Sequence, residues 1–481
     1  MIDTLTPGRI VVVGDLLLDR YITGSVNRIS PEAPVPVLLH AREHATPGGA
    51  ANVAANAAAL GAPVSLIGVA GADGAARTLR EKLAAWPGID TGGWVIDPAW
   101  TTITKTRILG GQQQIIRIDE EILAPFRAET NARLLAAVDA ALPGARVLVC
   151  SDYAKGVLSD EVIGGIMARA AAASVPVIVD PKRPTFGIYT GAALITPNRA
   201  EISRATLLPT DTDAQVEAAA RAASSQFGGD VLVTRSEQGM SLWQRAGSVR
   251  HVSAQRSEVF DVCGAGDTVV ATIATMLSAG LPLETAVVIA TTAAAISVSK
   301  HGTATVSRHE LQHALNGETT GHGNLVSLGE ATRIVADWRR HGARIVFTNG
   351  CFDLLHPGHI ALLRGAARQG DRLVVALNTD RSVAALKGPS RPVQDEHARA
   401  TVLGALRDVD LVVLFDEETP IKAIEALCPD VLVKGADYTE DQVVGAPFVR
   451  GYGGRVALID LIDGRSTTSL VRRAGAGQAN G

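Results

Sequence analysis

The sequence predicts an α/β protein in which a doubly wound parallel sheet with a small β lid is followed by a second α/β domain. The first observation behind this prediction is a repeated alternation of short apolar runs with stretches of helical length. The second is that many of these runs are continuously apolar, as expected for strands buried on both faces of a parallel sheet. The third is the length of 481 residues, which favours two or three domains.

The composition narrows the classes of protein that the chain fits. It contains 47% hydrophobic and 20% charged residues, as expected for a globular protein with an ample core. A formal net charge of −4 argues against an extended nucleic-acid surface, so small anionic ligands must be held by local clusters. The four cysteines form no CxxC pair, and we find neither a secretion signal nor an apolar run of membrane-spanning length. We therefore expect a cytoplasmic protein with reduced thiols and without a nucleic-acid or membrane partner.

The first predicted strand is Arg9–Gly14, a continuous apolar run that ends in glycine. Asp15 and Asp19 follow the C-terminal end of this strand. Because ligands bind at the carboxyl ends of strands in open α/β sheets, both carboxylates are candidates for binding sugar hydroxyls. An N-terminal helix cap or a surface charge is the alternative.

A small lid sheet is predicted from three β-rich segments that are interrupted by proline or glycine, namely Pro34–His40, Thr101–Leu109 and Gln114–Ile118. Between the first two lies the glycine pair Gly48–Gly49, which enters an alanine-rich helix. These glycines would let the backbone approach a sugar, and Asn52 can both donate and accept hydrogen bonds.

The middle of the chain repeats the order strand, loop, helix. Each of four apolar strands ends in a polar loop, and four such loops in succession favour a cleft along one edge of a parallel sheet, although each alone fits an ordinary turn. The strands and their loops are Ala145–Cys150 with Ser151–Gly156, Val175–Val179 with Asp180–Lys182, Leu194–Thr196 with Pro197–Glu201, and Val231–Thr234 with Arg235–Gly239.

The strongest motif of this first part is Phe260–Thr268, which precedes an apolar helix. Gly264, Ala265 and Gly266 would form an anion cradle at the N-terminus of that helix. Asp267 lies in the first turn, where a carboxylate can accept the proton of an attacking hydroxyl; a helix cap is the alternative. No Gly-x-x-x-x-Gly-Lys-Ser/Thr occurs and no Gly-x-Gly-x-x-Gly follows the first strand, which argues against a P-loop kinase and a dinucleotide oxidoreductase.

Gly-Ala-Gly-Asp in this context resembles the ribokinase-like sugar kinases, over roughly residues 9–310. The resemblance implies that Asp267 is the catalytic base and that Asn198 and Glu201 belong to the segment associated with the nucleotide's metal, with Glu201 contacting Mg²⁺ indirectly. Val262 departs from the family, which usually has threonine there, and this affects a side-chain phosphate contact but not the base. The assigned sugar-binding residues are Asp15, Asp19, Gly48, Gly49, Asn52 and Lys155, and the assigned nucleotide-binding residues are Asn198, Glu201, Thr234, Gly239, Gly264, Ala265 and Gly266.

A Gly- and Thr-rich segment, Asn316–Leu328, interrupts the periodicity and is the candidate linker. A predicted helix, Gly329–His341, then leads into the apolar strand Arg344–Phe347. We expect a sugar kinase domain over residues 1–318, a linker with its helix over 319–340, and a nucleotidyltransferase domain over 341–481.

The second domain is organised around Thr348–His359, in which a strand runs into a glycine turn and two histidines stand where a helix should begin. A helix N-terminus presents free N–H groups and a partial positive charge, and His356 and His359 at i and i+3 share one helix face. The motif therefore predicts a phosphate site. A structural role for the histidines, or zinc bound with Cys351 and Asp353, is the alternative.

His-x-Gly-His after Thr-Asn-Gly-x-Phe-Asp resembles the nucleotidyltransferase family that includes glycerol-phosphate cytidylyltransferase, over roughly residues 340–474. The resemblance implies that His356 and His359 hold the nucleotide phosphates during attack on the α-phosphorus. A solvated surface lysine is the alternative for Lys387, and plain helix capping is the alternative for the hydroxyls near the C-terminus. The nucleotide-binding residues assigned to this domain are Thr348, Asn349, Gly350, Phe352, Asp353, Lys387, Lys434, Ser466, Thr467 and Thr468.

The two halves in this order closely resemble the bifunctional heptose 7-phosphate kinase/heptose 1-phosphate adenylyltransferase family of bacterial lipopolysaccharide core synthesis. The resemblance implies that a ribokinase-like domain phosphorylates D-glycero-D-manno-heptose 7-phosphate at C1 with ATP. It also implies that a Rossmann-like domain transfers AMP from ATP to heptose 1-phosphate, giving ADP-heptose and pyrophosphate. The same resemblance implies Mg²⁺ with ATP and leaves a monovalent cation open. It also implies a homodimer through the kinase domain, for which lid strands capped within one chain are the alternative. The alternatives are another sugar or polyol phosphate with CTP, or a phosphosugar-binding regulator with decayed sites.

Overall fold

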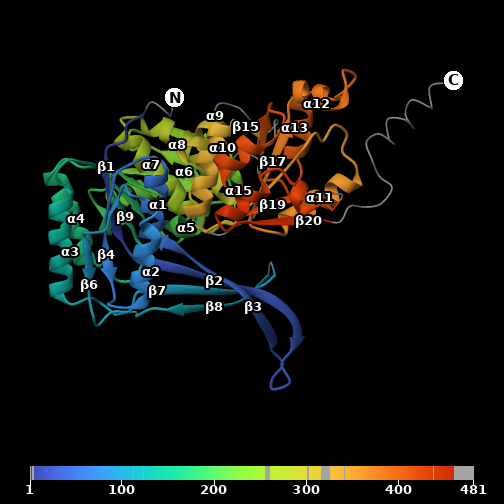
Figure 1. Cartoon of the computed structure of the whole chain (residues 1–481). Coiled ribbons are helices and arrows are strands. Elements are labelled where there is room, and N and C mark those ends of the chain that lie inside the picture. The colour runs from blue at the N-terminus through green and yellow to red at the C-terminus, as the bar shows by residue number, and fades with distance from the viewer. Residues whose placement is uncertain are drawn as a thin grey trace. The chain divides into compact units, whose positions relative to one another are not determined.

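A computed structural model of the chain forms two compact units, Met1–Gly317 and Glu318–Gly481, which are described separately (Figure 1). The structure describes residues 2, 5–111, 113–122, 124–254, 261–300, 303–315, 325–340, 342–436 and 438–459. Among the described helices, none combines the length and the apolar character that crossing a membrane requires.

The first unit is built on a ten-stranded sheet with the order β14-β13-β12-β11-β10-β9-β1-β4-β5, in which β6 pairs with β4. The strands from β12 to β5 run parallel, whereas β13 and β14 form an antiparallel edge. Their bounds are β1 (Arg9–Gly14), β4 (Val64–Ala70), β5 (Ile89–Asp90), β6 (Trp94–Ile96), β9 (Ala145–Ser151), β10 (Val177–Asp180), β11 (Leu194–Ile195), β12 (Asp230–Thr234), β13 (Met240–Trp243) and β14 (Val249–Val252).

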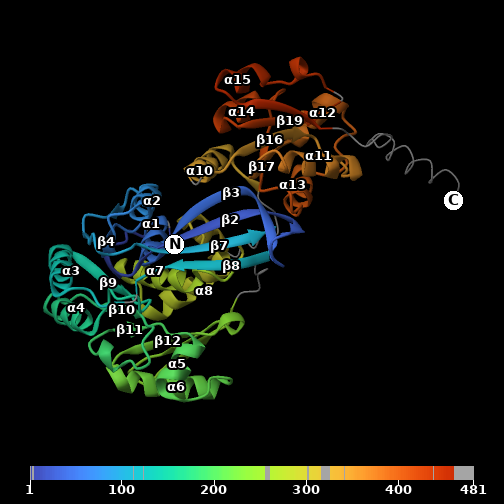
Figure 2. The ribbon, with the colours of Figure 1, turned by 90° about the horizontal axis from the view of Figure 1, so that it is seen from below.

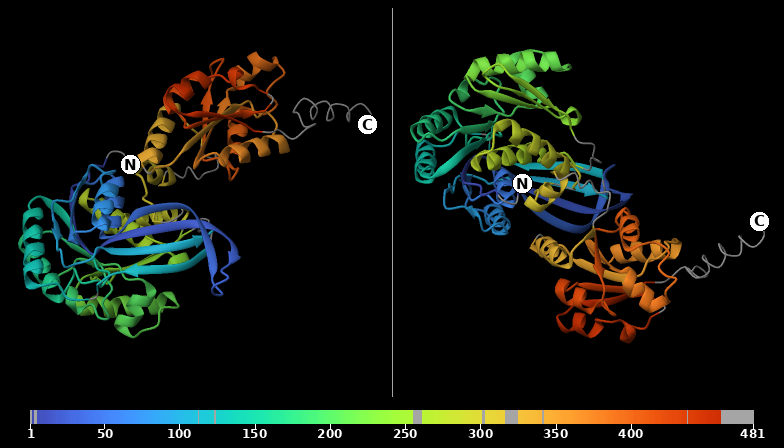
Figure 3. Two further views of the ribbon diagram at one scale, coloured as in Figure 1. Left: turned by 60° about the horizontal axis from the view of Figure 1, so that its bottom comes forward. Right: turned by 90° about the horizontal axis from the view of Figure 1, so that it is seen from above.

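Helices cover both faces of this sheet (Figures 2 and 3). Ile10 and Val12 of β1 pack into one core with α1 (Ala50–Ala59), α2 (Gly74–Leu83), α7 (Ala265–Ser278), α8 (Leu283–Val298) and α9 (Arg308–Leu315). Val11 and Val13 pack into the other core with α3 (Ala128–Ala141), α4 (Asp160–Ala172), α5 (Arg199–Thr206) and α6 (Asp213–Phe227). Because successive side chains of a strand point to opposite faces, a continuous apolar run is what a strand between two cores requires. The predicted doubly wound sheet is confirmed.

A second sheet of four strands, in the order β3-β2-β7-β8, forms the predicted lid and extends beyond the main sheet (Figure 1). Its strands are β2 (Leu16–Ile29), β3 (Pro36–Gly49), β7 (Ile103–Gly110) and β8 (Gln113–Glu120). The sequence indicated three of these strands but not β2, which lies in the middle of the lid and carries Asp19. Only Asp15 separates the end of β1 from the start of β2, so the buried beginning of β2, Leu16–Leu18, reads as a continuation of the main-sheet strand.

The second unit contains a six-stranded parallel sheet with the order β15-β18-β17-β16-β19-β20. Its strands are β15 (Leu325–Val326), β16 (Ile345–Gly350), β17 (Arg372–Asn378), β18 (Leu411–Phe415), β19 (Val431–Gly435) and β20 (Arg455–Ile459). Figure 2 shows helices on both sides of this sheet, namely α10 (Leu328–Arg340), α11 (Pro357–Ala367), α12 (Asp380–Lys387), α13 (Glu396–Gly404), α14 (Ile421–Leu427) and α15 (Ala446–Gly451). The predicted Rossmann-like α/β architecture is therefore present.

Candidate active sites

Asp267 lies in the first turn of α7 and is 3% exposed. The helix begins at Ala265 because Gly264, at φ 78°, adopts the left-handed conformation that favours glycine. A Cβ at Gly264 would lie 2.8 Å from Nδ2 of Asn52, so the turn and the Asn52 amide are closely packed. Gly266 completes the predicted cradle immediately before Asp267.

Both carboxylate oxygens of Asp267 accept hydrogen bonds from other elements. Asn52 in α1 donates from Nδ2 to Oδ2 over 2.7 Å, and the hydroxyl of Tyr153 donates to Oδ1 over 2.8 Å. Tyr153 follows β9, and the sequence does not identify it as a site residue. The two residues are 114 positions apart, and no local spacing signals such a contact.

Burial raises the pKa of Asp267 to about 6, and the nearby charge of Asp19 adds to this effect. The hydrogen bonds from Asn52 and Tyr153 act in the opposite direction, because they stabilise the charged carboxylate. Burial and the charge of Asp267 raise the pKa of Tyr153 well above its ordinary value, so its hydroxyl remains a donor. At pH 7 the carboxylate of Asp267 is therefore mostly deprotonated and suited to accept a proton.

The predicted sugar-binding residues meet near this base. Asp19, on β2, is buried and forms an ion pair with Arg107 of β7. A Cβ at Gly48 would collide with Oδ2 of Asp19, so a larger residue here would displace this carboxylate. Gly49 is the N-cap of α1, the helix that carries Asn52. Lid strands and α1 thus bring Asp19, Gly48, Gly49 and Asn52 to one region.

Asp15 is completely buried, and its carboxylate holds the loop that carries Tyr153. Oδ2 accepts the backbone N–H groups of Tyr153 and Lys155 over 3.0 and 3.1 Å, and Oδ1 accepts that of Val157 over 3.1 Å. Burial and the neighbouring charge of Asp152 raise the pKa of Asp15 to about 6. Among the predicted sugar ligands, Asp15 therefore has a clear positioning role, while the ammonium of Lys155 pairs with Glu121 over 2.7 Å.

The predicted nucleotide side lies at the carboxyl ends of β10, β11 and β12. Asn198 caps α5, and Glu201 completes a capping box by accepting the backbone N–H of Asn198 over 2.8 Å. Thr234 lies beside Asn198 in an isolated parallel bridge. Gly239 ends the following turn, where its carbonyl accepts the backbone N–H of Arg235 over 2.8 Å.

Two charged residues of this region, Asp180 and Lys182, are not among the predicted site residues. Lys182, in the loop after β10, forms an ion pair with Glu201. Asp180, at the end of β10, is buried, and this raises its pKa to about 8. Burial acts to lower the pKa of Lys182. The charges of Asp180 and Glu201 have a larger combined effect and raise this pKa. Lys182 thus places a positive charge between the base and the nucleotide side.

In the second unit, the two predicted histidines lie together where α11 begins. His356 is the N-cap residue, and its ring stacks on that of His359 with centroids 3.8 Å apart. Phe352 contacts His359 edge-on at 5.2 Å. Burial, together with the charges of His356 and Lys387, lowers the pKa of His359 to about 4. A pocket of about 520 Å³ borders His356 and the exposed side of α11.

The end of β16 supplies the other predicted groups of this site. Thr348 donates its hydroxyl to the carbonyl of Val433 over 3.0 Å, and Lys434 donates to the carbonyl of Asn349 over 3.0 Å. Among the described residues, the buried Oδ1 of Asn349 has no hydrogen-bond partner, and such an atom fits a ligand donor. A Cβ at Gly350 would lie 3.0 Å from the ring of Phe352.

The carboxylate of Asp353 already has protein partners, so its oxygens are not free to bind zinc. It forms an ion pair with Arg391 and accepts the backbone N–H of Val393 over 2.6 Å. These donors lower the pKa of Asp353, although burial acts to raise it. In the described part of the chain, no three His, Cys, Asp or Glu side chains form a metal-binding group. Ser466, Thr467 and Thr468 lie outside the described residues.

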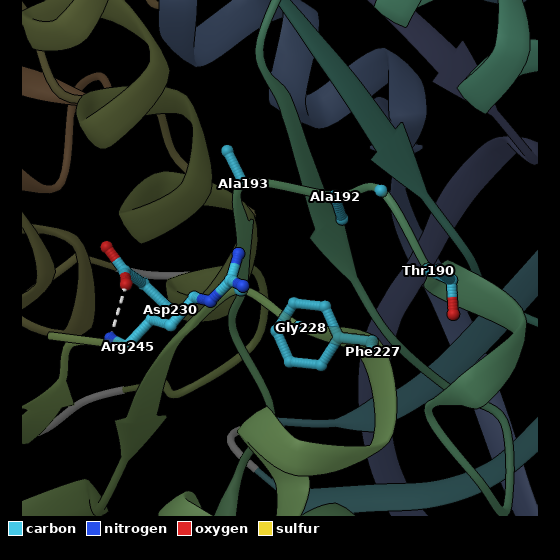
Figure 4. A pocket seen from close by; sticks show the side chains of 9 residues that line it. Thr190, Ala192, Ala193, Phe227, Gly228, Asp230 and Arg245 are labelled. Carbon is cyan, nitrogen blue, oxygen red and sulfur yellow. Dashed lines mark hydrogen bonds between the residues drawn. The ribbon is translucent and has the colours of Figure 1, made fainter. Parts of the chain in front are cut away.

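A further pocket, of about 460 Å³, lies in the first unit between Thr190–Ala193, Phe227–Asp230 and Arg245 (Figure 4). Thr190–Ala193 precede β11 and Phe227–Asp230 lead into β12, so the pocket lies at the amino ends of these strands. Asp267, Asn198 and Thr234 lie at the opposite, carboxyl edge of the sheet. This pocket is therefore separate from the candidate active site.

The fold and the sites define two classes of enzyme in one chain. A doubly wound sheet with a β lid and a buried carboxylate at a glycine-initiated helix is the arrangement of a sugar kinase. A parallel sheet with stacked histidines at a helix N-terminus is the arrangement of a nucleotidyltransferase. Residues 8–310 match the family described as pfkB family carbohydrate kinase, and residues 347–459 match the family described as Cytidylyltransferase-like.

Similar proteins extend this result to the whole chain. The protein called Bifunctional protein HldE of Gluconobacter oxydans is 63% identical over 472 residues, covering 98% of each chain, and that of Azorhizobium caulinodans is 60% identical over 468 residues, covering 97% of this chain and 98% of the relative. The chain belongs to the HldE family of bifunctional proteins. It is a sugar kinase and an adenylyltransferase of ADP-heptose synthesis, and its ligands are a sugar and ATP with a divalent metal ion.

Solved structures support the fold of the first unit. A structure of Arabidopsis thaliana ribokinase complexed with ribose and ATP is 22% identical, with a TM-score of 0.53, and covers 64% of this chain and 99% of that chain. Phosphofructokinase-2 of Escherichia coli in complex with potassium is 20% identical, with a TM-score of 0.56, and covers 65% of this chain and 99% of that chain.

Proposed function

We propose that the first unit, over residues 1–318, phosphorylates D-glycero-D-manno-heptose 7-phosphate at C1. Asp267 removes the proton of the C1 hydroxyl, which attacks the γ-phosphorus of ATP and releases ADP and heptose 1,7-bisphosphate. The observation that carries this proposal is the buried carboxylate of Asp267 at the start of α7, held by Asn52 and Tyr153. The backbone N–H groups of Gly264, Ala265 and Gly266 stabilise the charge on the transferred phosphoryl group.

Lys182, Asn198 and Glu201 form the nucleotide side of this proposal, with Thr234 and Gly239 nearby. One oxygen of Glu201 accepts the N–H of Asn198 and the other pairs with Lys182, so the carboxylate fits an indirect contact with Mg²⁺ through water. When bound with ATP, Mg²⁺ supplies positive charge that offsets the charge of the phosphate oxygens. A monovalent cation is a second candidate ion, and kinase rates compared between potassium and tetramethylammonium salts test it.

We propose that the second unit, over residues 341–481 after the linker and helix of 319–340, transfers AMP from ATP to heptose 1-phosphate. The nucleophile is already an anion, so positioning and charge neutralisation suffice and no general base is needed. The stacked rings of His356 and His359, the ammonium of Lys387 and the N-terminus of α11 are the groups that hold the triphosphate. ADP-heptose and pyrophosphate are the products.

Two substitutions test whether the activities are independent. Asp267→Asn removes the base and is expected to abolish phosphorylation of heptose 7-phosphate while adenylylation of supplied heptose 1-phosphate continues. His356→Ala is expected to have the opposite effect. Loss of both activities in either folded variant contradicts the proposal of two separate sites.

The choice of nucleotide is tested separately. With heptose 1-phosphate as the acceptor, pyrophosphate release is expected with ATP and not with CTP. Faster release with CTP would favour the cytidylyl alternative for the second unit.

We further propose a cytoplasmic homodimer that forms through the lid. All four cysteines are free thiols, as expected in a reducing compartment. Ile115, Ile116 and Ile118 on the lid strand β8 are 37%, 52% and 46% exposed, so the lid carries apolar surface that a second copy would cover. Sedimentation of the full chain as a monomer at micromolar concentration would contradict the homodimer.

A further inference from the structure

One face of the lid sheet turns toward the catalytic base, and its register shows which side chains lie there. Asp19 of β2 is paired in register with Lys105 of β7, and Lys105 with Asp119 of β8. Residues paired in register across neighbouring strands point to the same face of a sheet. Because the ammonium of Lys105 lies 5.6 Å from the centroid of the Tyr153 ring, whose hydroxyl donates to Asp267, this face is the inner face of the lid. Lys105 therefore lies on the inner face.

Three other cations on or beside this face are paired with acidic residues. Arg107 pairs with Asp19, and Arg117 pairs with Asp119 over 2.8 Å. Lys155, in the loop after β9, pairs with Glu121 over 2.7 Å. These positive charges are thus already balanced before any substrate binds.

Lys105 differs from its neighbours. It is half-buried, yet within the described residues it forms no ion pair or hydrogen bond with a carboxylate. Its ammonium lies 5.6 Å from the centroid of the Tyr153 ring. Burial lowers the pKa of Lys105. The attraction of Asp19 and Asp119 does not compensate, because Lys155 and Arg117 repel the ammonium. An ammonium removed from water without a counter-ion is costly, so this position favours an anion.

The ring of Tyr153 lies near two lysines with different surroundings. Lys182 lies 5.8 Å from the ring centroid and is neutralised by Glu201 on the nucleotide side. Lys105 approaches the same ring from the lid, next to the sugar-binding Asp19. The hydroxyl of this ring donates to Asp267, so Tyr153 contacts both the base and Lys105.

We propose that Lys105 binds the phosphate group that the sugar substrate already carries, and so selects phosphorylated over free sugar. This inference rests on the proposed kinase function, because a heptose 7-phosphate presents a hydroxyl at one end and a phosphate dianion at the other. The dianion supplies the counter-charge that Lys105 lacks, and the lysine donates charge-assisted hydrogen bonds to it. The lid then recognises the remote end of the substrate, while Asp267 acts on C1.

The experiment compares Lys105→Met with Lys105→Arg in the full-length enzyme. Lys105→Met is expected to raise the KM for heptose 7-phosphate by about 10- to 100-fold, because one charge-assisted hydrogen bond is lost. Its kcat is expected to stay within about threefold, since the lost contact is equally strong in the ground state and the transition state. Lys105→Arg keeps the charge and should restore most of the affinity.

Arg20→Met is the matched control. Arg20 neighbours Asp19 on β2, so its side chain points to the opposite face of the lid, where its Nε donates to Glu43 over 3.1 Å. This control should leave both KM and kcat unchanged. An unchanged kcat of the kinase reaction, with unchanged thermal unfolding of the first unit, shows that the variants are folded.

A second substrate makes the result specific for phosphate. The preference of the wild type for heptose 7-phosphate over heptose without phosphate is expected to fall by the same 10- to 100-fold in Lys105→Met, with little change for the free sugar. An unchanged KM, or equal losses with both sugars, would overturn the role of Lys105. Failure of the wild type to phosphorylate heptose 7-phosphate would instead contradict the proposed kinase function, so the two failures are distinguishable.

Discussion

Replacing Tyr153 by phenylalanine removes one hydroxyl from the kinase site and leaves the aromatic ring in place. That hydroxyl donates to Oδ1 of Asp267 over 2.8 Å and lowers the pKa of the base, which burial raises to about 6. A hydrogen bond to a charged group contributes about 1.5–3 kcal/mol, and about 1.4 kcal/mol corresponds to a tenfold change in an equilibrium constant. The ionisation of Asp267 in Tyr153→Phe should therefore move upward by about one to two pH units.

The assay is the pH dependence of kcat/KM for phosphorylation of heptose 7-phosphate, because this parameter reports the ionisations of the free enzyme. The wild-type rate should fall as the pH drops through about 6, where Asp267 gains its proton. In Tyr153→Phe this acid limb should move to higher pH. The rate at pH 7 should fall by about two- to tenfold, since less of the base is deprotonated, and should recover near pH 9.

Tyr189→Phe provides a control of the same chemistry. Its buried hydroxyl donates to Asp152 over 2.8 Å and not to the base, so the acid limb should stay in place. A uniform loss of rate in Tyr153→Phe, with the acid limb unmoved, would refute the conclusion that the hydroxyl adjusts the pKa of Asp267.

Three other substitutions should affect one unit only. Gly264→Ala places a Cβ in a left-handed residue and 2.8 Å from Nδ2 of Asn52, so kinase kcat should fall at least about tenfold while adenylylation persists. Asp15→Asn leaves at least one buried loop N–H without an acceptor, so urea unfolding of the kinase unit should show a loss of about 1–3 kcal/mol. The buried Arg399 pairs with Asp380 and donates to the carbonyl of Cys351 over 2.7 Å. Because Arg399→Met leaves this buried carbonyl without its donor, it should destabilise the transferase unit by about 1–3 kcal/mol, measured by its thermal unfolding, with the kinase rate unchanged.

The sequence predicts features that are determined locally. The glycines before Asp267 and the histidines that begin α11 are neighbours in the chain, so their spacing alone indicates a helix N-terminus with catalytic groups. The continuous apolar run of β1 likewise indicates a strand between two cores.

The remaining features depend on contacts between distant parts of the chain. Tyr153 reaches Asp267 across 114 positions, and Arg399 reaches the carbonyl of Cys351 across 48. Such contacts follow from strand order and loop conformation, which periodicity does not reveal. Strand β2 was not predicted because its buried start continues β1 and its outer half is largely polar and exposed, without a strict alternation.

The β2–β3 hairpin of the lid is joined to the catalytic centre at both of its ends. β2 begins directly after Asp15, which holds the Tyr153 loop, and β3 ends at Gly49, directly before the helix that carries Asn52. The N–H of Ala50 donates to the carbonyl of Asp15 over 3.0 Å, so the two ends are also tied to each other. No loop separates the ends of the hairpin from Asp15 and from the helix that carries Asn52. Bending of the lid over a sugar would therefore change the hydrogen bonds that orient Asp267. Binding of the sugar would in this way be coupled to the position of the carboxylate that removes the proton.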